Sequence, residues 1–170
     1  MKRVLLLLAI LTFSLVGCSD EKQKTFDFNF DHVLKVVETA YGKENIKVVD
    51  DSKEKGFNTI VLPNKLIIQA TIDKDTKKVV DVKSGITFDG YAAGNRSDML
   101  KSFQTVFNIV DSEMSIGNRD KVMSDLNINI DTDFLKNKEI STNSNIDYSI
   151  SPYDDNIVLS AKPGLKYGKE

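Results

Sequence analysis

Residues 65–88 read KLIIQATIDKDTKKVVDVKSGITF and contain two apolar segments separated by a polar one. The segments 65–72 and 79–88 are rich in Val, Ile and Thr, which favour strands. Residues 73–77, DKDTK, have the composition of a turn, and a connection this short joins antiparallel strands. The stretch therefore predicts a β-hairpin and, with it, an antiparallel sheet.

The chain before this hairpin predicts a helix and further strands. Residues 31–41 repeat apolar side chains with the helical period, with Asp31 as the expected N-cap and Gly42 as the expected end. Residues 26–30 alternate Phe with polar side chains, which predicts an extended segment. We expect its rings to pack on the core, with a sheet edge or a membrane as the alternative contact. Two segments of strand composition follow the helix, at 45–49 and 57–62.

The chain after the hairpin predicts a second, more apolar helix over residues 97–111. Phe103 and Phe107 lie one turn apart on its apolar face, so we expect both rings in the core. The remaining elements are a short helix over 119–126, a long polar loop over 127–145, and a closing hairpin with strands at 146–150 and 157–161.

This order of elements predicts an α+β domain in which helices cover one face of an antiparallel sheet. It is similar to cystatin-like and TATA-binding-protein-like arrangements, and other topologies fit it as well. The 170 residues, 41% hydrophobic and 28% charged, are typical of one globular domain. The expected organisation is a signal peptide at 1–17, a lipidated N-terminus and tether at 18–25, the domain at 26–162 and a C-terminal tail at 163–170.

The N-terminus has the three parts of a secretory signal. Lys2 and Arg3 form a positive region, residues 4–16 form an apolar region, and Gly17 and Cys18 follow at once. The apolar region is shorter than the ~20 residues that a membrane-spanning helix needs. These features indicate export and cleavage after Gly17.

Leu15-Val16-Gly17-Cys18 resembles the lipobox of bacterial lipoproteins. The resemblance implies cleavage between Gly17 and Cys18 and transfer of a diacylglyceryl group to the Cys18 thiol. Two acyl chains suffice for stable anchoring, whereas one gives only marginal binding. The expected location is therefore the extracytoplasmic face of the cell membrane, with Cys18 as the anchor.

The composition also indicates the kind of bacterium that the chain comes from and the classes of partner that it binds. Lysine, Asn and Ile are abundant, which is typical of a low-GC Gram-positive bacterium; in a Gram-negative cell, Ser19 would instead direct the protein to the outer membrane. Cleavage leaves 21 Lys and Arg against 25 Asp and Glu, a formal charge of −4. An acidic chain without a basic cluster is a poor nucleic-acid binder. The expected partners are the membrane and a protein or small molecule at the cell surface.

The sequence contains few side chains of the types that catalyse reactions or bind metals. His32 is the only histidine and Cys18 the only cysteine, so neither a His metal cluster nor a His-paired nucleophile can form. The acidic segments 73–75, 131–133 and 154–155 lack the spacing of a calcium loop and are interpreted as turns. We expect no catalytic residue, metal or cofactor.

Three functions remain as hypotheses. The first is a lipid-anchored lipoprotein that acts as a non-catalytic binding or interaction module. The second is a small cell-wall hydrolase that uses a pair of carboxylates. The third concerns the cleaved segment, because residues 10–17, ILTFSLVG, are similar to the hydrophobic peptide pheromones that some enterococci release from lipoprotein signal peptides.

Overall fold

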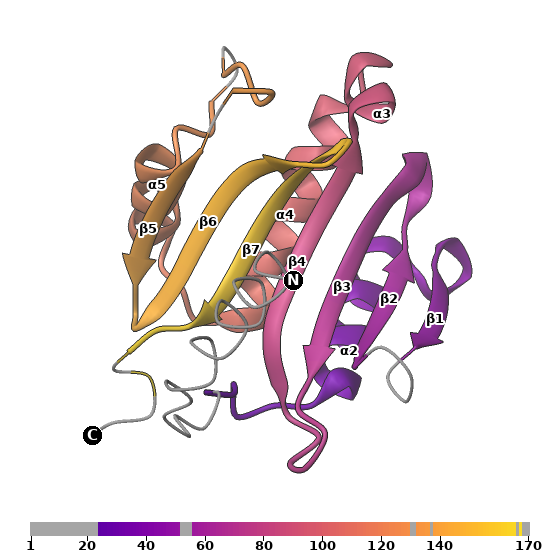
Figure 1. Ribbon diagram of the computed structural model, residues 1–170, viewed down its shortest axis with the longest axis vertical. Coiled ribbons are helices and arrows are strands. Elements are labelled where there is room, and N and C mark those ends of the chain that lie inside the picture. Colours follow the sequence, from indigo (N-terminus) through magenta and orange to yellow (C-terminus); the bar gives the residue numbers. More distant parts are fainter. Residues whose placement is uncertain (1–23, 52–55, 130–131, 137, 166, 168–170) are drawn as a thin grey trace, which may run out of the picture.

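The structure, a computed structural model, describes residues 24–51, 56–129, 132–136, 138–165 and 167. They form one sheet of seven strands in the order β1-β2-β3-β4-β7-β6-β5, with every neighbouring pair antiparallel. Figure 1 shows the strands side by side, with β4 and β7 at the centre. The strands are β1 (Lys47–Asp51), β2 (Phe57–Val61), β3 (Leu66–Ile72), β4 (Val79–Thr87), β5 (Glu139–Asn143), β6 (Ile146–Tyr153) and β7 (Asn156–Pro163).

Three helices lie on the same face of this sheet, behind the strands in Figure 1. Helices α2 and α4 pack against each other and against β3, α4 also contacts β4 and β7, and α5 covers β5. The α+β class and the placement of helices on one face are therefore confirmed. The helices are α2 (Phe30–Tyr41), α3 (Phe88–Ala92), α4 (Arg96–Val110) and α5 (Ile116–Asp125), with short 3₁₀ turns η1 (Lys43–Asn45) and η2 (Pro63–Lys65).

The sheet consists of two meanders that meet at its centre. Strands β1 to β4 form one meander and β5 to β7 the other. Their junction is the pairing of β4 with β7, in which Val82 lies opposite Ala161 and Gly85 opposite Val158. Because these partners are distant in sequence, the seven-stranded sheet forms only when both halves of the chain are present.

The ends of α2 follow from its flanking residues. The N-cap is Asn29, whose side-chain oxygen accepts hydrogen bonds from the backbone N–H groups of Asp31 at 3.1 Å and His32 at 3.4 Å. The expectation of Asp31 as N-cap was therefore wrong by two residues, because Asn29 satisfies the free amides first. Gly42 ends the helix as expected, with φ of 83°, a conformation that glycine adopts at little cost.

The core lies between α4 and the centre of the sheet. Phe103 and Phe107 are completely buried, which confirms the expectation from the apolar spacing of the helix. The Phe107 ring packs edge-on against Tyr148 of β6, with 5.3 Å between ring centroids. Helix α4 thus contacts strands of both meanders.

The alternating Phe residues near the N-terminus run beside the start of β4. The Phe26 N–H donates to the Val79 carbonyl at 2.7 Å, and the Val79 N–H donates to the Phe28 carbonyl at 3.0 Å. Phe26 is completely buried and stacks on Phe28 at 5.0 Å. The expectation that these rings pack on the core is confirmed for Phe26, which is buried inside the domain.

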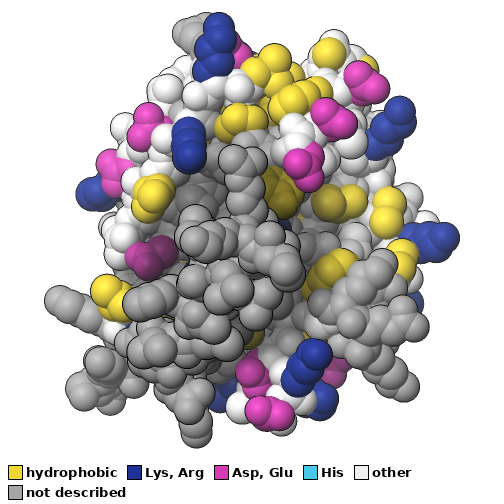
Figure 2. All heavy atoms as spheres, in the orientation of Figure 1, with side chains coloured by type: hydrophobic (Ala, Val, Ile, Leu, Met, Phe, Trp, Pro, Cys, Tyr) yellow, Lys and Arg dark blue, Asp and Glu magenta, His cyan; other side chains and the backbone are white. Residues whose placement is uncertain are grey.

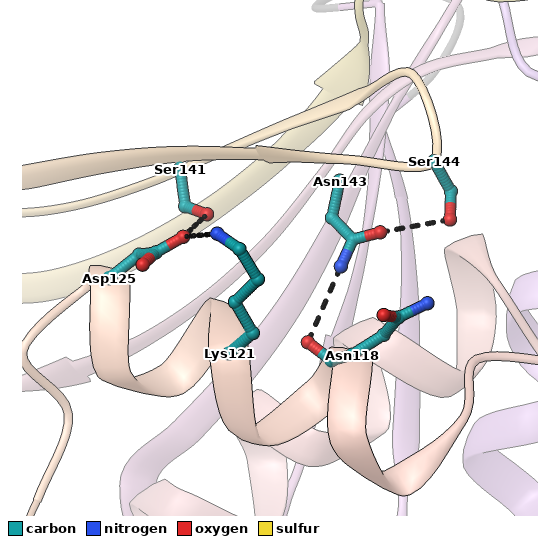
Figure 3. A network of polar contacts seen from close by, with 6 residues as sticks. All are labelled: Asn118, Lys121, Asp125, Ser141, Asn143 and Ser144. Atoms are coloured by element: carbon teal, nitrogen blue, oxygen red, sulfur yellow. Dashed lines mark hydrogen bonds and ion pairs between the residues drawn. The ribbon is translucent and has the colours of Figure 1, made fainter.

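The long loop expected over residues 127–145 was wrong at its end, where β5 forms an edge strand. Its pairing with β6 places Ser141 opposite Tyr148. The side chains of β5 are mostly polar, so the alternation of apolar residues that marks a strand is absent. Figure 3 shows why this polar strand stays in place: Ser141 donates to Asp125 of α5 at 2.9 Å, and Asn143 donates to the Asn118 carbonyl at 3.4 Å.

Candidate functional site

The face of the sheet opposite the helices, here called the outer face, carries the candidate site. Side chains alternate along each strand, so every second residue of β3, β4, β7 and β6 points to this face. The registers align two rows of them across the four strands. One row is Gln69, Lys83, Ser160 and Ser149, and the other is Ile67, Gly85, Val158 and Ser151.

These rows line a groove of about 510 Å³. It spans the junction of the two meanders, so both halves of the chain contribute to it. Figure 2 looks onto this face and shows acidic and basic side chains mixed around its margin. The lining residues are Ile67, Gln69, Lys83, Gly85, Ser149, Ser151, Tyr153, Asn156, Val158, Ser160 and Lys162.

Gly85 has no side chain and therefore leaves the middle of the groove open. A Cβ atom at this position would lie 3.6 Å from Cγ1 of Ile67 and 3.7 Å from Cγ2 of Val158, in ordinary contact with both. Glycine weakens the interior of a strand and often marks a place where another group approaches the backbone closely. A larger side chain at residue 85 would therefore fill the groove between the two aliphatic walls.

A polar cluster stands beside this floor. Asp81, only 5% exposed, accepts a hydrogen bond from Ser160 Oγ at 2.7 Å and forms an ion pair with Lys83 Nζ at 3.1 Å. A buried carboxylate is tolerated when such partners satisfy it. The Lys83 side chain is 40% exposed and lines the groove, and an ammonium group has three donors in all.

The contacts within the cluster are directed at the Asp81 carboxylate. The Ser160 hydroxyl donates to Asp81 Oδ1, and Lys83 Nζ forms an ion pair with Oδ2 of the same carboxylate. The residues that line the groove include no His, Cys, Asp or Glu. Among the described residues, no group of three such side chains is placed to hold a metal ion.

His32 lies away from this groove. Its Nε2 atom is 2.9 Å from the Ile109 carbonyl of α4, and its ring centroid is 4.5 Å from that of Phe28. These contacts attach the N-terminal segment to α4. His32 also lines a separate pocket of about 420 Å³ between α2 and the end of α4.

The acidic segments act in turns where the structure describes them. Asp73 Oδ1 accepts hydrogen bonds from the N–H groups of Asp75 and Thr76 and from the Thr76 hydroxyl. The bonds from Thr76 are the main reason that the pKa of Asp73 is lowered. Asp133 accepts from the Leu135 N–H at 3.2 Å in a similar way. The interpretation as turns is confirmed for residues 73–75 and for residues 154–155, which form the turn between β6 and β7, whereas Asp131 lies outside the described residues.

The predicted lipidation site lies elsewhere in the chain. Gly17 and Cys18 fall outside the described residues, so cleavage and lipidation stay predictions from the sequence. Within the part of the chain that the structure describes, no helix is long and apolar enough to cross a membrane.

The fold and the groove together define an α+β domain with a groove of polar and aliphatic side chains on the outer face of its sheet. No protein-family model, curated protein or solved structure matches the chain. The groove residues were not identified from the sequence, because they are distributed over four strands. The one available signal was Gly85, an isolated glycine inside a Val- and Ile-rich strand.

Proposed function

We propose that the chain is a lipoprotein, anchored through Cys18 to the extracytoplasmic face of the cell membrane, whose domain binds a ligand in the outer-face groove without catalysing a reaction. The anchor rests on the signal peptide and lipobox, Leu15-Val16-Gly17-Cys18. The binding role rests on one observation: hydroxyl, amide, ammonium and aliphatic side chains from both meanders converge on the groove.

The lining indicates the chemistry of the ligand. Lys83 and Lys162 favour a carboxylate or phosphate group, and Gln69 and Asn156 pair with hydroxyl or amide groups. Ile67 and Val158 offer an apolar surface beside Gly85. These features fit an anionic ligand rich in hydroxyl or amide groups.

The competing hydrolase has no support from this groove. Glycoside cleavage by carboxylates requires an acid and a base about 5–10 Å apart across the bond that breaks. The residues that line the groove provide neither. The pheromone hypothesis concerns residues 10–17, which the structure does not describe, and it stays a prediction from the sequence.

Two probes carry the expected ligand chemistry: muropeptides, which supply carboxylates, and glycerol-phosphate oligomers, which supply phosphates. Each is added to the ¹⁵N-labelled soluble domain, and the amide shifts are recorded. We expect one probe to shift Gln69, Lys83 and Ser160 together. If neither probe shifts these amides, the groove is not the binding site proposed here.

A matched pair of variants separates the groove from the rest of the molecule. Gly85→Leu places a side chain in the groove and should abolish the shifts. Gly117→Leu makes the same change on α5, where a Cβ atom has no neighbour within 4 Å, and should leave binding intact. Undiminished binding by a folded Gly85→Leu variant would contradict the proposal.

The anchor is tested in cells. Cys18→Ser removes the thiol that would accept the lipid, so the protein should appear in the medium or remain as an unprocessed precursor. Membrane retention and a mature mass identical to those of the unaltered protein would refute lipidation.

A further inference from the structure

The centre of the outer-face groove brings together a hydrogen-bond acceptor, a donor and a small apolar notch. Lys83 and Ser160 lie opposite each other in the pairing of β4 with β7. Gly85 and Val158 form the next pair on the same face, with Ile67 of β3 on the other side of Gly85. Residues two positions apart in a strand are separated by about 7 Å, so one small ligand group reaches both pairs.

The buried Asp81 carboxylate determines how the Ser160 hydroxyl can bind a ligand. Asp81 is only 5% exposed, and its Oδ1 atom accepts the hydrogen bond from Ser160 Oγ at 2.7 Å. A carboxylate can only accept hydrogen bonds, and a hydroxyl group has one proton, so the lone pairs of Ser160 Oγ remain for the ligand. A ligand group at Ser160 must therefore donate a hydrogen bond.

Lys83 has the opposite hydrogen-bonding character. Its Nζ atom lies 3.1 Å from Asp81 Oδ2, and an ammonium group has three donors, so donors remain for an acceptor on the ligand. The Asp81 charge also offsets that of Lys83. A neutral group that carries both a donor and an acceptor therefore fits beside Lys83 and Ser160.

The notch at Gly85 lies next to this donor and acceptor. A Cβ atom at residue 85 would be 3.6 Å from Cγ1 of Ile67 and 3.7 Å from Cγ2 of Val158. A ligand methyl group above Gly85 would contact the same two aliphatic side chains, and burial of apolar surface is favourable. The third feature that the centre of the groove can recognise is thus a methyl group.

We propose that the centre of the groove binds the acetamido group of a glycan built from N-acetylated amino sugars. The acetamido N–H donates to Ser160 Oγ, its carbonyl oxygen accepts from Lys83 Nζ, and its methyl group packs above Gly85. The inference rests on the proposed function of the groove and names the class of its ligand.

The rest of the groove fits a glycan better than a peptide. Strands β3, β4, β7 and β6 each have a neighbour on both sides, so a peptide cannot join the sheet there as a further strand. Tyr153, 68% exposed, lines the groove near the β6–β7 turn and offers an aromatic ring on which a sugar ring can pack. Amide and hydroxyl side chains that pair with sugar hydroxyls line the remainder, namely Gln69, Asn156, Ser149 and Ser151.

Two neutral tetrasaccharides that differ in the acetamido group test the proposal. Tetra-N-acetylchitotetraose carries this group on every sugar, whereas cellotetraose carries a hydroxyl group in its place. Isothermal titration calorimetry on the unaltered protein, purified in a mild detergent, measures the affinity for each. We expect the acetylated sugar to bind at least about tenfold more tightly, because two hydrogen bonds and an apolar contact depend on its acetamido group.

Two variants identify the part of the groove that makes this distinction. Gly85→Ala places a methyl group in the notch at ordinary contact distances, so the variant should fold but lose most of the preference for the acetylated sugar. Gly117→Ala on α5 is its control and should keep the preference. Asp81→Asn removes the charged acceptor of the Ser160 proton and should also reduce the preference, whereas Asp120→Asn, an exposed change on α5, should not.

Equal affinity for the two tetrasaccharides, or no binding of either, would overturn the proposal. An unchanged preference in Gly85→Ala would overturn it as well, even if Asp81→Asn fails to fold. Equally tight binding of N-acetylated tetra-alanine would show that the groove recognises amides of peptides and not of a glycan. All these results leave the groove as a binding site if muropeptides or glycerol-phosphate oligomers still shift its amides, so the two proposals fail separately.

Discussion

Ser84 of β4 and Ser102 of α4 share a hydrogen bond of 2.7 Å in the completely buried interior. Ser102 Oγ in turn donates to the Met99 carbonyl at 2.7 Å, so each hydroxyl has a partner. This pair links the central strand of the sheet to the helix that covers it. A polar contact thus fixes the position of α4 within an otherwise apolar layer.

The first prediction follows from this pair. Ser102→Ala leaves the buried Ser84 hydroxyl without its acceptor, which should lower the free energy of unfolding by about 1–3 kcal/mol. The double variant Ser84→Ala, Ser102→Ala should lose less than the sum of the two single variants, since neither group is then left unpaired. Urea denaturation of the four proteins measures this coupling, and strict additivity would contradict it.

The second prediction concerns the apolar face of α4. Phe103→Ala removes a completely buried ring and should lower the free energy of unfolding by about 3–5 kcal/mol. Gln104→Ala, an exposed neighbour on the same helix, should change it by no more than about 0.5 kcal/mol. An unchanged urea midpoint for Phe103→Ala would show that this ring does not support the core.

The third prediction concerns the contact between α5 and β5 shown in Figure 3. The hydrogen bond from Lys121, followed by that from Ser141, lowers the pKa of Asp125. A lowered folded-state pKa means that this carboxylate stabilises the protein above the unfolded value of about 3.9 and loses that effect as the pH falls through the folded-state value.

Asp125→Asn should therefore be less stable than the unaltered protein at neutral pH, and the difference should shrink below about pH 4. Asp120→Asn, which changes an exposed carboxylate on the same helix, is the control. Urea midpoints measured across this pH range decide the matter, and a pH-independent difference for Asp125→Asn would count against the role of its charge.

The fourth prediction concerns Tyr148, whose buried hydroxyl has no hydrogen-bond partner among the described residues. Burial, followed by the nearby Asp111 charge, raises the pKa of Tyr148. Tyr148→Phe removes an unsatisfied polar atom and should not lower the free energy of unfolding. Tyr91→Phe should lower it by about 1 kcal/mol, because the Tyr91 hydroxyl accepts a hydrogen bond from Arg96 at 3.0 Å.

The same hydroxyl gives a dependence on pH. Above pH of about 10 the unfolded Tyr148 loses its proton while the folded one keeps it, so stability falls as the pH rises. In Tyr148→Phe this alkaline loss should be smaller. An identical alkaline loss in both proteins, measured by thermal denaturation, would contradict the raised pKa.

Local patterns were enough to predict the elements that carry strong apolar periodicity. The hairpin of residues 65–88 and the helix that contains Phe103 have such patterns, and both form within two residues of the expected bounds. Strand β5 was missed because its side chains are mostly polar and only its pairing with β6 and its bonds to α5 make it a strand. Helix α3 was missed because five residues are too few for a period.

Export and lipid attachment are properties that short linear motifs encode, so the sequence alone predicts Cys18 as the anchor. The groove is a different kind of feature. Lys83 and Ser160 become neighbours only through the register of β4 with β7, and their common partner Asp81 is buried by that pairing. Such long-range registers depend on how the two meanders close into one sheet, because burial of a shared core selects the pairing and no local pattern of residues specifies it.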